Sequence, residues 1–193
     1  MAQFEEAYEI TLGHEGGYSN DPDDVGGETY KGIARNYHSD WPGWAIIDNA
    51  KGSNNFPKNL QTTTGLEPLV KEFYKEKFWD KFWGDKIKNQ KISNELFDTS
   101  VNMGIGRTVK FLQKSLNLLN RNGINYPDIV EDGAFGENTL KSLESCLGLG
   151  DYKVLYNILN VMQGGQYIES MTKNSTQEKY ARGWFKRVDI IKQ

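Results

Sequence analysis

Residues 14–33, which read HEGGYSNDPDDVGGETYKGI, most constrain what this chain can fold into. Five glycines, a proline and three aspartates in twenty residues favour turns and short strands over any long regular element. Two glutamates and a threonine lie in the same run, so side chains able to bind protons or water gather there. The run therefore predicts a loop or hairpin that carries a dense polar site.

An apolar stripe leads into this run. Its members recur at the spacing of one helical face: Phe4, Tyr8, Leu12 and, three positions later, Glu15. We predict a helix that ends at the glycine pair after Glu15, because glycine adopts the left-handed conformation of a helix terminus at low cost. A carboxyl group at that end is partly desolvated and lies near the negative pole of the helix dipole. Both effects favour its protonated form, so Glu15 is a candidate general acid.

Acidic residues follow the glycine pair within a turn-rich segment. Asp21, Asp23 and Asp24 precede Thr29 to Ile33, which alternates weakly like a short strand. Turn chemistry and solvation alone would account for the three aspartates. A calcium loop would need a bidentate glutamate at its twelfth position, which here is Gly32. The segment therefore predicts acids held near Glu15 rather than a calcium site.

The run EGGYSNDPDDVGGETYKGIA resembles the signature of the glycoside hydrolase 108 family, N-acetylmuramidases related to phage-type lysozymes. The resemblance implies that Glu15 is the catalytic acid. The run also resembles the spacing of the catalytic Glu, Asp and Thr in phage-type lysozymes. This spacing places the aspartate at Asp24. Thr29 corresponds to the threonine, although it comes one residue earlier than the spacing suggests. We assign Asp24 and Thr29 to orienting the water, with the acids Asp21, Asp23 and Glu28 left as alternatives for the second role.

The chemistry that this resemblance implies is cleavage of the β-1,4 linkage between N-acetylmuramic acid and N-acetylglucosamine in peptidoglycan. One protonated carboxyl group must reach the glycosidic oxygen, and an anionic group must position water or stabilise the transition state. A carboxylate separation of roughly 6.5–9.5 Å would indicate inversion, and about 5 Å would indicate retention.

Five further residues are candidates for substrate binding. Tyr18 and Asn20 lie in the run itself, and Trp44 could stack on a sugar ring, although a packing role is the alternative. The stretch FDTSVNMGIGR resembles a second block of the same family, which implies that Asn102 and Gly104 lie near the substrate.

A second informative stretch lies in the C-terminal half. Asp132, Gly133, Phe135 and Gly136 resemble the DGxFGxxT turn of peptidoglycan-binding modules, and the alternative is a plain tight turn leading into a helix. We therefore expect a lysozyme-like catalytic region over 1–104 and a helical peptidoglycan-binding region over 105–193 that packs back on it.

Helical periodicity recurs along the rest of the chain. It predicts helices over 66–83, over 107–119 and over 140–147. A further helix is expected to begin at an N-cap at Ser93, with Asn102 near its C-terminus. The last predicted helix covers 152–191, with a bend or interruption at Gly164–Gly165. Residues 36–64 are predicted to be irregular. The expected fold is mainly α and lysozyme-like, with a short β-hairpin element near 24–33.

Composition excludes several other classes. A net charge of −3 gives no attraction to nucleic acid or an anionic membrane, and no apolar run approaches the ~20 residues of a membrane span. Cys146 is the only cysteine and histidines number two, so we expect no disulfide, no metal and no cofactor. The N-terminus lacks the basic start and apolar block of a signal peptide.

We therefore predict a monomeric muramidase whose partner is bacterial peptidoglycan. It would be made in the cytoplasm and would reach the wall by a route without a signal peptide, such as the release or lysis used by endolysins. The alternatives are a lytic transglycosylase, which closes a 1,6-anhydro ring, and a non-catalytic wall-binding or secretion-accessory protein.

Overall fold

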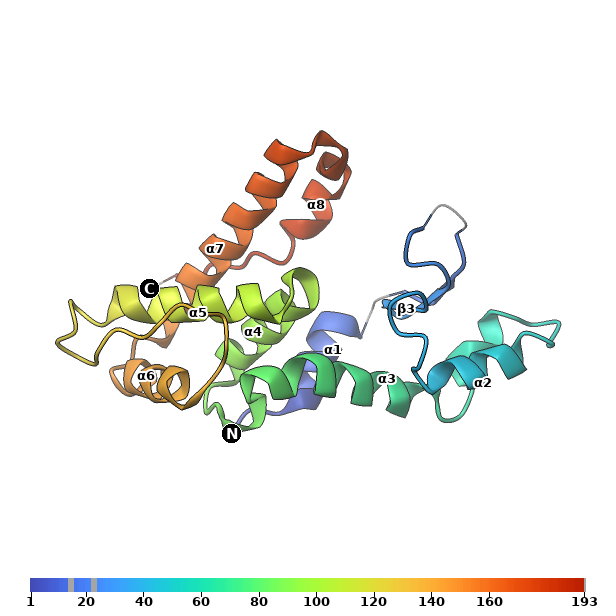
Figure 1. The fold of residues 1–193 in the computed structure, drawn as a ribbon, viewed down its shortest axis with the longest axis horizontal. Helices are drawn as coiled ribbons and strands as arrows, with labels where there is room; N and C mark the ends of the chain where they lie inside the picture. Colours follow the sequence, from blue (N-terminus) through green and yellow to red (C-terminus); the bar gives the residue numbers. More distant parts are fainter. Residues whose placement is uncertain (14–15, 22–23, 193) are drawn as a thin grey trace. The chain divides into compact units, whose positions relative to one another are not determined.

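The computed structural model describes residues 1–13, 16–21 and 24–192 of the chain. Within these ranges the protein is mainly helical, with one small antiparallel sheet, as predicted (Figure 1). The helices are α1 (Phe4–Leu12), α2 (Gly43–Ala50), α3 (Leu66–Tyr74), α4 (Gln90–Met103), α5 (Ile105–Leu119), α6 (Glu137–Gly148), α7 (Tyr152–Lys173) and α8 (Ala181–Trp184). The strands are β1 (Tyr18–Ser19), β2 (Thr29–Tyr30) and β3 (Ile33–Ala34).

The chain divides into two compact units. One comprises Tyr8–Lys77, and the other comprises Met1–Ala7 together with Phe78–Gln193. Helices α4 and α5 both belong to the second unit, on either side of the domain boundary that we place after residue 104. That boundary stays a prediction.

The sheet of the Tyr8–Lys77 unit has the order β1-β2-β3, with Tyr30 opposite Ile33 across the β2–β3 hairpin. Lys31 and Gly32 form the turn, with φ values of 45° and 79°. Two successive positive φ values define the primed turn that matches the twist of a hairpin. Residues 29–33, predicted as one short strand, therefore reverse direction in their middle.

Helices α2 and α3 pack against each other in this unit, over a core that includes Trp41, Ile47 and Val70. The prediction that 36–64 is irregular is wrong for α2 and for the 3-10 helix η1 (Lys58–Thr62). Helix α2 starts directly after a proline, and its Gly43 lies under the ring of Trp41, where a Cβ atom would come within 2.1 Å of the indole. Glycine at position 43 therefore leaves room for the Trp41 ring at the start of α2.

The predicted helix over 66–83 is regular only as far as Tyr74. The π-helical turn η2 (Lys75–Trp79) and the 3-10 turns η3 (Asp80–Phe82) and η4 (Gly84–Lys86) follow it. In the second unit Trp79 and Phe82 are both fully buried, with Trp79 in edge contact with Phe4 and Phe97. The change of helical pitch brings both rings into one aromatic cluster.

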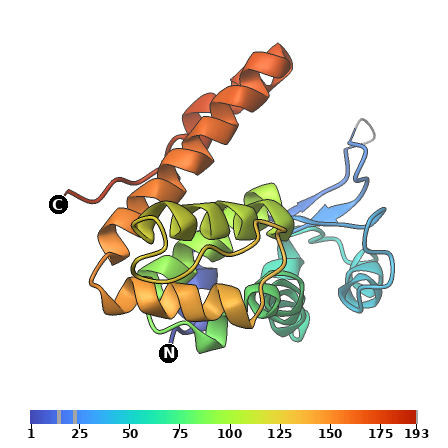
Figure 2. The same cartoon turned by 60° about the vertical axis from the view of Figure 1, so that its left-hand side comes forward.

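Helix α4 packs against α5 and α7, and α5 packs against α6 (Figure 2). The N-cap of α4 is Asn89, whose side chain accepts a hydrogen bond from the Ile92 amide at 3.1 Å. The prediction of Ser93 as the cap is therefore wrong, because Ser93 lies in the first turn, where it is fully buried.

Helix α7 runs through Gly164–Gly165 without a break, so the predicted interruption is wrong. A Cβ atom at Gly164 would lie 3.5 Å from Val188, so the missing side chain makes room for the returning C-terminal segment. The helix ends at Lys173, and the chain turns through η5 (Ser175–Tyr180) into the short α8 beside α7 (Figure 1). The predicted helix up to residue 191 is therefore also wrong.

Candidate active site

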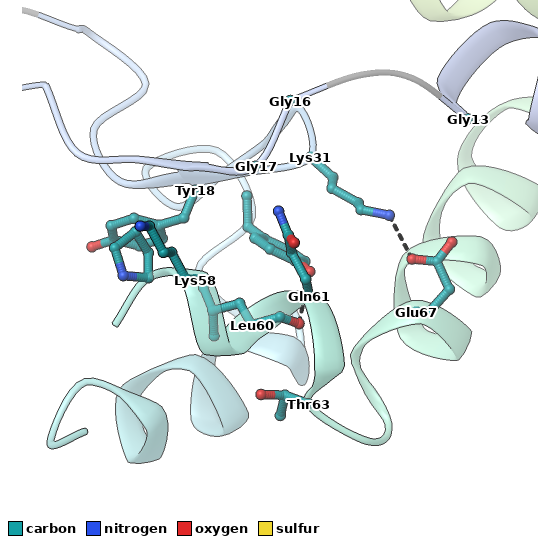
Figure 3. Close-up of a pocket in the computed structure, with 12 residues that line it drawn as sticks. Gly13, Gly16, Gly17, Tyr18, Lys31, Lys58, Leu60, Gln61, Thr63 and Glu67 are labelled. Carbon is teal, nitrogen blue, oxygen red and sulfur yellow. Dashed lines mark hydrogen bonds and ion pairs between the residues drawn. The ribbon is translucent and has the colours of Figure 1, made fainter. Parts of the chain in front are cut away.

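The Tyr8–Lys77 unit contains a pocket of about 620 Å³ (Figure 3). Its lining comes from the chain after α1, from β1, from the β2–β3 hairpin, from η1 and from the start of α3. The described lining residues are Gly13, Gly16, Gly17, Tyr18, Tyr30, Lys31, Pro57, Lys58, Leu60, Gln61, Thr63 and Glu67. Aromatic rings and hydrogen-bonding side chains thus share one cavity, which is the usual composition of a saccharide site.

Glu15, the predicted acid, lies outside the described residues, as does Asp23. The sequence places Glu15 between Gly13 and Gly16, and both of these glycines line the pocket.

A charged pair closes one end of the pocket. The Lys31 ammonium lies 2.6 Å from Glu67 Oε2, and the Tyr8 hydroxyl donates to Glu67 Oε1 at 3.0 Å. Burial, the largest influence, acts to raise the pKa of Glu67, but the bonds from Lys31 and Tyr8 hold it below its usual value. Glu67 is therefore an anion at neutral pH and does not suit the role of a proton donor.

Glu28 belongs to a second charged cluster. Its side chain is 10% exposed and pairs with Arg35 at 2.6 Å and with Lys51 at 2.7 Å. Burial again acts to raise its pKa, but hydrogen bonds from Lys51, Arg35 and Tyr18 lower it overall. The Asp48 carboxylate also pairs with both cations, with Arg35 at 2.5 Å and with Lys51 at 2.7 Å. These contacts join the sheet to α2, so Glu28 has an evident structural role.

Asp24 and Thr29 are both engaged in the turn between β1 and β2. Asp24 Oδ1 accepts a hydrogen bond from the Gly26 amide at 2.8 Å, and the Thr29 hydroxyl donates to the Gly27 carbonyl at 3.1 Å. Asp24 is exposed, whereas Thr29 is half-buried. Neither is among the described lining residues of the pocket, so their assigned role in orienting water stays a prediction.

The predicted substrate-binding residues of this unit differ in their placement. Tyr18 lines the pocket, with its ring 4.7 Å from that of Phe56, and Asn20 is exposed. Trp44 is only 2% exposed, and its indole donates to the His38 carbonyl at 2.7 Å. The sugar-stacking role predicted for Trp44 does not fit this burial, whereas the packing alternative does.

Asn102 and Gly104 lie in the second unit, at the junction of α4 and α5. The exposed Asn102 donates to the Asp98 carbonyl at 2.7 Å, and Gly104 has a φ of 83° between the two helices. These contacts are those of a helix terminus, and the predicted substrate contact of both residues remains untested.

The turn predicted to bind peptidoglycan is built around Gln113 of α5. The Gln113 amide donates to Asp132 Oδ1 at 2.9 Å, and its oxygen accepts from the Gly133 amide at 2.9 Å. Phe135 contacts Trp83 edge-on at 5.6 Å, and Gly136 precedes α6. The sequence reading identified the turn but missed Gln113, since a buried glutamine on a helix gives no signal by itself.

The described residues offer no sign of a metal site or of a membrane span. Within them, His, Cys, Asp and Glu side chains form no group of three or more that could hold a metal ion. Helices long and apolar enough to cross a membrane are likewise not found in this part of the chain.

Comparison with known proteins divides the chain into two matched regions. Residues 8–104 match the family model described as glycosyl hydrolase 108, and residues 107–189 match that of a predicted peptidoglycan domain. Both resemblances found in the sequence are thereby confirmed. Among curated proteins no significant match is found. The structure of Brucella abortus SagA is similar in fold, with a TM-score of 0.59, 23% sequence identity, and coverage of 96% of this chain and 88% of that one.

Proposed function

Because the chain belongs to the glycosyl hydrolase 108 family and continues into a peptidoglycan domain, we propose that it hydrolyses the glycan strands of peptidoglycan. The proposed reaction is that of an N-acetylmuramidase, which cleaves the β-1,4 linkage between N-acetylmuramic acid and N-acetylglucosamine. Glu15 is the proposed general acid, and Asp24 and Thr29 are the proposed residues that orient the water.

The main support is the coincidence of the family match with the pocket. All twelve described lining residues fall within the matched range 8–104, and those nearest Glu15 in sequence lie on either side of it. A cavity of about 620 Å³ with aromatic and amide side chains suits a saccharide rather than an extended apolar ligand.

In the proposed mechanism Glu15 donates its proton to the glycosidic oxygen as the bond to the anomeric carbon breaks. Positive charge then develops on the sugar ring, and a carboxylate is needed either to stabilise it or to activate the attacking water. Asp24 is our choice for that carboxylate because of the resemblance to phage-type lysozymes, with Asp21 and Asp23 as alternatives. Glu28 and Glu67 suit the role less well, since both are paired with lysine or arginine.

The peptidoglycan domain supplies the second part of the proposal. Residues 107–189 would hold the enzyme on its polymeric substrate while the first region cleaves, with the turn at Asp132, Gly133, Phe135 and Gly136 as the proposed contact. Linking two binding regions raises the effective substrate concentration at the catalytic one.

The test is digestion of purified peptidoglycan by the full chain and by its Glu15→Gln variant. We expect the wild type to lower turbidity and release reducing ends, and the variant to lose at least about a hundredfold in rate, the contribution typical of a general acid. Full activity of the variant would refute the assignment of Glu15. Mass spectrometry of the products would show 1,6-anhydro ends instead if the enzyme were a transglycosylase.

A further inference from the structure

Lys31 has a backbone conformation that a lysine rarely adopts. Its φ of 45° lies in the left-handed region, where asparagine, aspartate or glycine is the usual residue of a hairpin turn. Neighbouring groups fix this conformation from two sides. The Lys31 amide donates to the Gly17 carbonyl at 3.2 Å, and the Tyr74 hydroxyl donates to the Lys31 carbonyl at 2.8 Å. A strained residue held by its surroundings is a candidate for function.

The side chain of Lys31 reaches over one end of the pocket toward Glu67, while Tyr18 and Lys58 lie at the other end (Figure 3). Glu67 holds the ammonium at 2.6 Å and is itself fixed by the Tyr8 hydroxyl. An ammonium group carries three N–H donors, so one carboxylate partner leaves donors for a ligand. The side chain keeps 29% of its surface exposed, which makes it accessible from the pocket.

The charges of the described lining residues favour an electron-rich ligand group. They comprise two lysines, Lys31 and Lys58, and one carboxylate, Glu67, whereas the whole chain has a net charge of −3. A lysine ammonium is a compact point charge that binds carbonyl and carboxylate oxygens more strongly than sugar hydroxyls.

Building on the proposed function, we propose that Lys31 is a substrate-binding residue that recognises the lactyl arm of muramic acid, with Glu67 and Tyr8 as its positioning residues. The lactyl arm ends in an amide carbonyl when a stem peptide is attached and in a carboxylate when it is not. Both groups accept a hydrogen bond from an ammonium. N-acetylglucosamine lacks this arm, so Lys31 would let the pocket distinguish peptidoglycan from chitin.

The test compares the binding of two soluble tetrasaccharides that differ only in the lactyl group. One is the peptide-free peptidoglycan tetrasaccharide, and the other is chitotetraose. We expect the wild-type chain to bind the first about tenfold more tightly, the ratio that one charge-assisted hydrogen bond gives. Lys31→Met should bring the two dissociation constants within about twofold of each other, and Lys31→Arg should restore part of the preference. Lys91→Met, which changes an exposed lysine of α4 in the other unit, is the matched control and should keep the wild-type ratio.

Glu67→Gln provides a second variant in case Lys31→Met disturbs the hairpin, as judged by its thermal unfolding. Glutamine has the shape of the Glu67 side chain but bonds the Lys31 ammonium more weakly. We therefore expect this variant to prefer the peptidoglycan tetrasaccharide to an intermediate degree. The proposal is overturned if the wild type binds both tetrasaccharides equally, or if folded Lys31→Met and Glu67→Gln keep the wild-type ratio.

Release of reducing ends from peptidoglycan is measured in parallel. If the wild type hydrolyses peptidoglycan but the variants keep the wild-type binding ratio, the proposed role of Lys31 is refuted and the proposed function is not. A preference that depends on Lys31, without any hydrolysis by the wild type, would refute the proposed function while leaving Lys31 as a binding residue.

Discussion

Arg187 and Asp98 form an ion pair across 89 positions of sequence, with Nη1 of the arginine 2.5 Å from Oδ1 of the carboxylate. Gln163 of α7 donates to the other carboxylate oxygen at 3.0 Å. Two backbone amides of the C-terminal segment donate hydrogen bonds to α7. The Asp189 amide donates to the Asn160 side chain at 2.7 Å, and the Ile191 amide donates to the Asn157 side chain at 2.8 Å. Polar contacts to α4 and α7 therefore help to fasten the C-terminal segment, beside the stacking of Trp184 on Tyr167 of α7.

Replacing Arg187 with methionine should lower the free energy of unfolding by about 2 kcal/mol, because it removes the ionic partner of Asp98, whose side chain is only 16% exposed. Urea unfolding followed by circular dichroism measures the change. Arg182→Met, at an exposed position five residues earlier, should change it by less than about 0.5 kcal/mol. Equal effects of the two substitutions would mean that the ion pair contributes nothing specific.

Stability should also depend on pH through Glu95, a buried residue of α4. Burial raises the pKa of Glu95 to about 8, and the Asp98 carboxylate adds to this shift, while hydrogen bonds with Asn160 and Thr99 oppose it. The carboxyl group is thus protonated in the folded chain at pH values where the unfolded chain, with a pKa near 4.5, has lost the proton. Its stabilising contribution is complete below about pH 4.5 and is lost as the pH rises toward 8.

Glu95→Gln removes this titration while keeping a neutral side chain of the same shape. The stability of the variant relative to the wild type should therefore increase with pH, by roughly 1 kcal/mol per pH unit between pH 5 and pH 8. Urea unfolding of both proteins at these two pH values measures this change. Because the free energy of the wild type is subtracted from that of the variant, the contributions of other titrating groups cancel. A difference that does not vary with pH would show that Glu95 ionises normally in the folded chain.

Local periodicity was sufficient to predict most of the helices. The stripe Phe4, Tyr8 and Leu12 is buried along α1, and the apolar positions Leu112 and Leu116 are buried in α5 as expected. Such stripes are visible in sequence because one helical turn is enough to define them. The glycine pair at 164–165 predicts an interruption that α7 does not have, because Gly164 instead marks a close contact with Val188 and Phe185 of the returning C-terminal segment.

The candidate site was predictable only where a motif marked it. The run around Glu15 predicts the region of the pocket, but nothing in the sequence singles out Lys31 within that run. The role that we propose for Lys31 depends on its ion pair with Glu67, which lies 36 positions later, and on a hairpin turn with a positive φ. Contacts of this kind are set by tertiary structure and leave no periodic signal.

Gln113 provides a test of the turn that we propose to contact peptidoglycan. The residue is 2% exposed, and its side chain bonds Asp132, the Gly133 amide and the Ala134 carbonyl. Gln113→Leu should cost about 2–3 kcal/mol of stability, because it leaves buried polar groups without partners.

The same substitution should also weaken the retention of the chain on insoluble peptidoglycan in a sedimentation assay. Lys114→Leu, at the exposed neighbouring position, is the control and should alter neither quantity. Normal retention by folded Gln113→Leu would show that the geometry of the turn does not matter for binding.

Asp24 and Glu28 can be separated by comparing rate with stability. Asp24→Asn keeps the oxygen that accepts the Gly26 amide, so the turn and the melting temperature should be preserved. If Asp24 is the second catalytic carboxylate, the rate of peptidoglycan hydrolysis should still fall by about two orders of magnitude, because an amide neither activates water nor stabilises positive charge. Asp21→Asn, in the same loop, tests the alternative assignment and should retain most of the rate. A larger loss in Asp21→Asn than in Asp24→Asn would assign the second role to Asp21.

Glu28→Gln should show the opposite pattern, since it leaves Arg35 and Lys51 without the anion that joins the sheet to α2. We expect a loss of about 2 kcal/mol in the free energy of unfolding at pH 7. The pKa of Glu28 is lowered in the folded chain, so its contribution is present above the ordinary value of 4.5 and is lost as the pH falls through the lowered folded-state pKa. The stability gap between wild type and variant should therefore close at low pH. A variant that unfolds normally at pH 7 yet no longer hydrolyses peptidoglycan would instead identify Glu28 as the second carboxylate, and Asp24 would then be a residue of the turn alone.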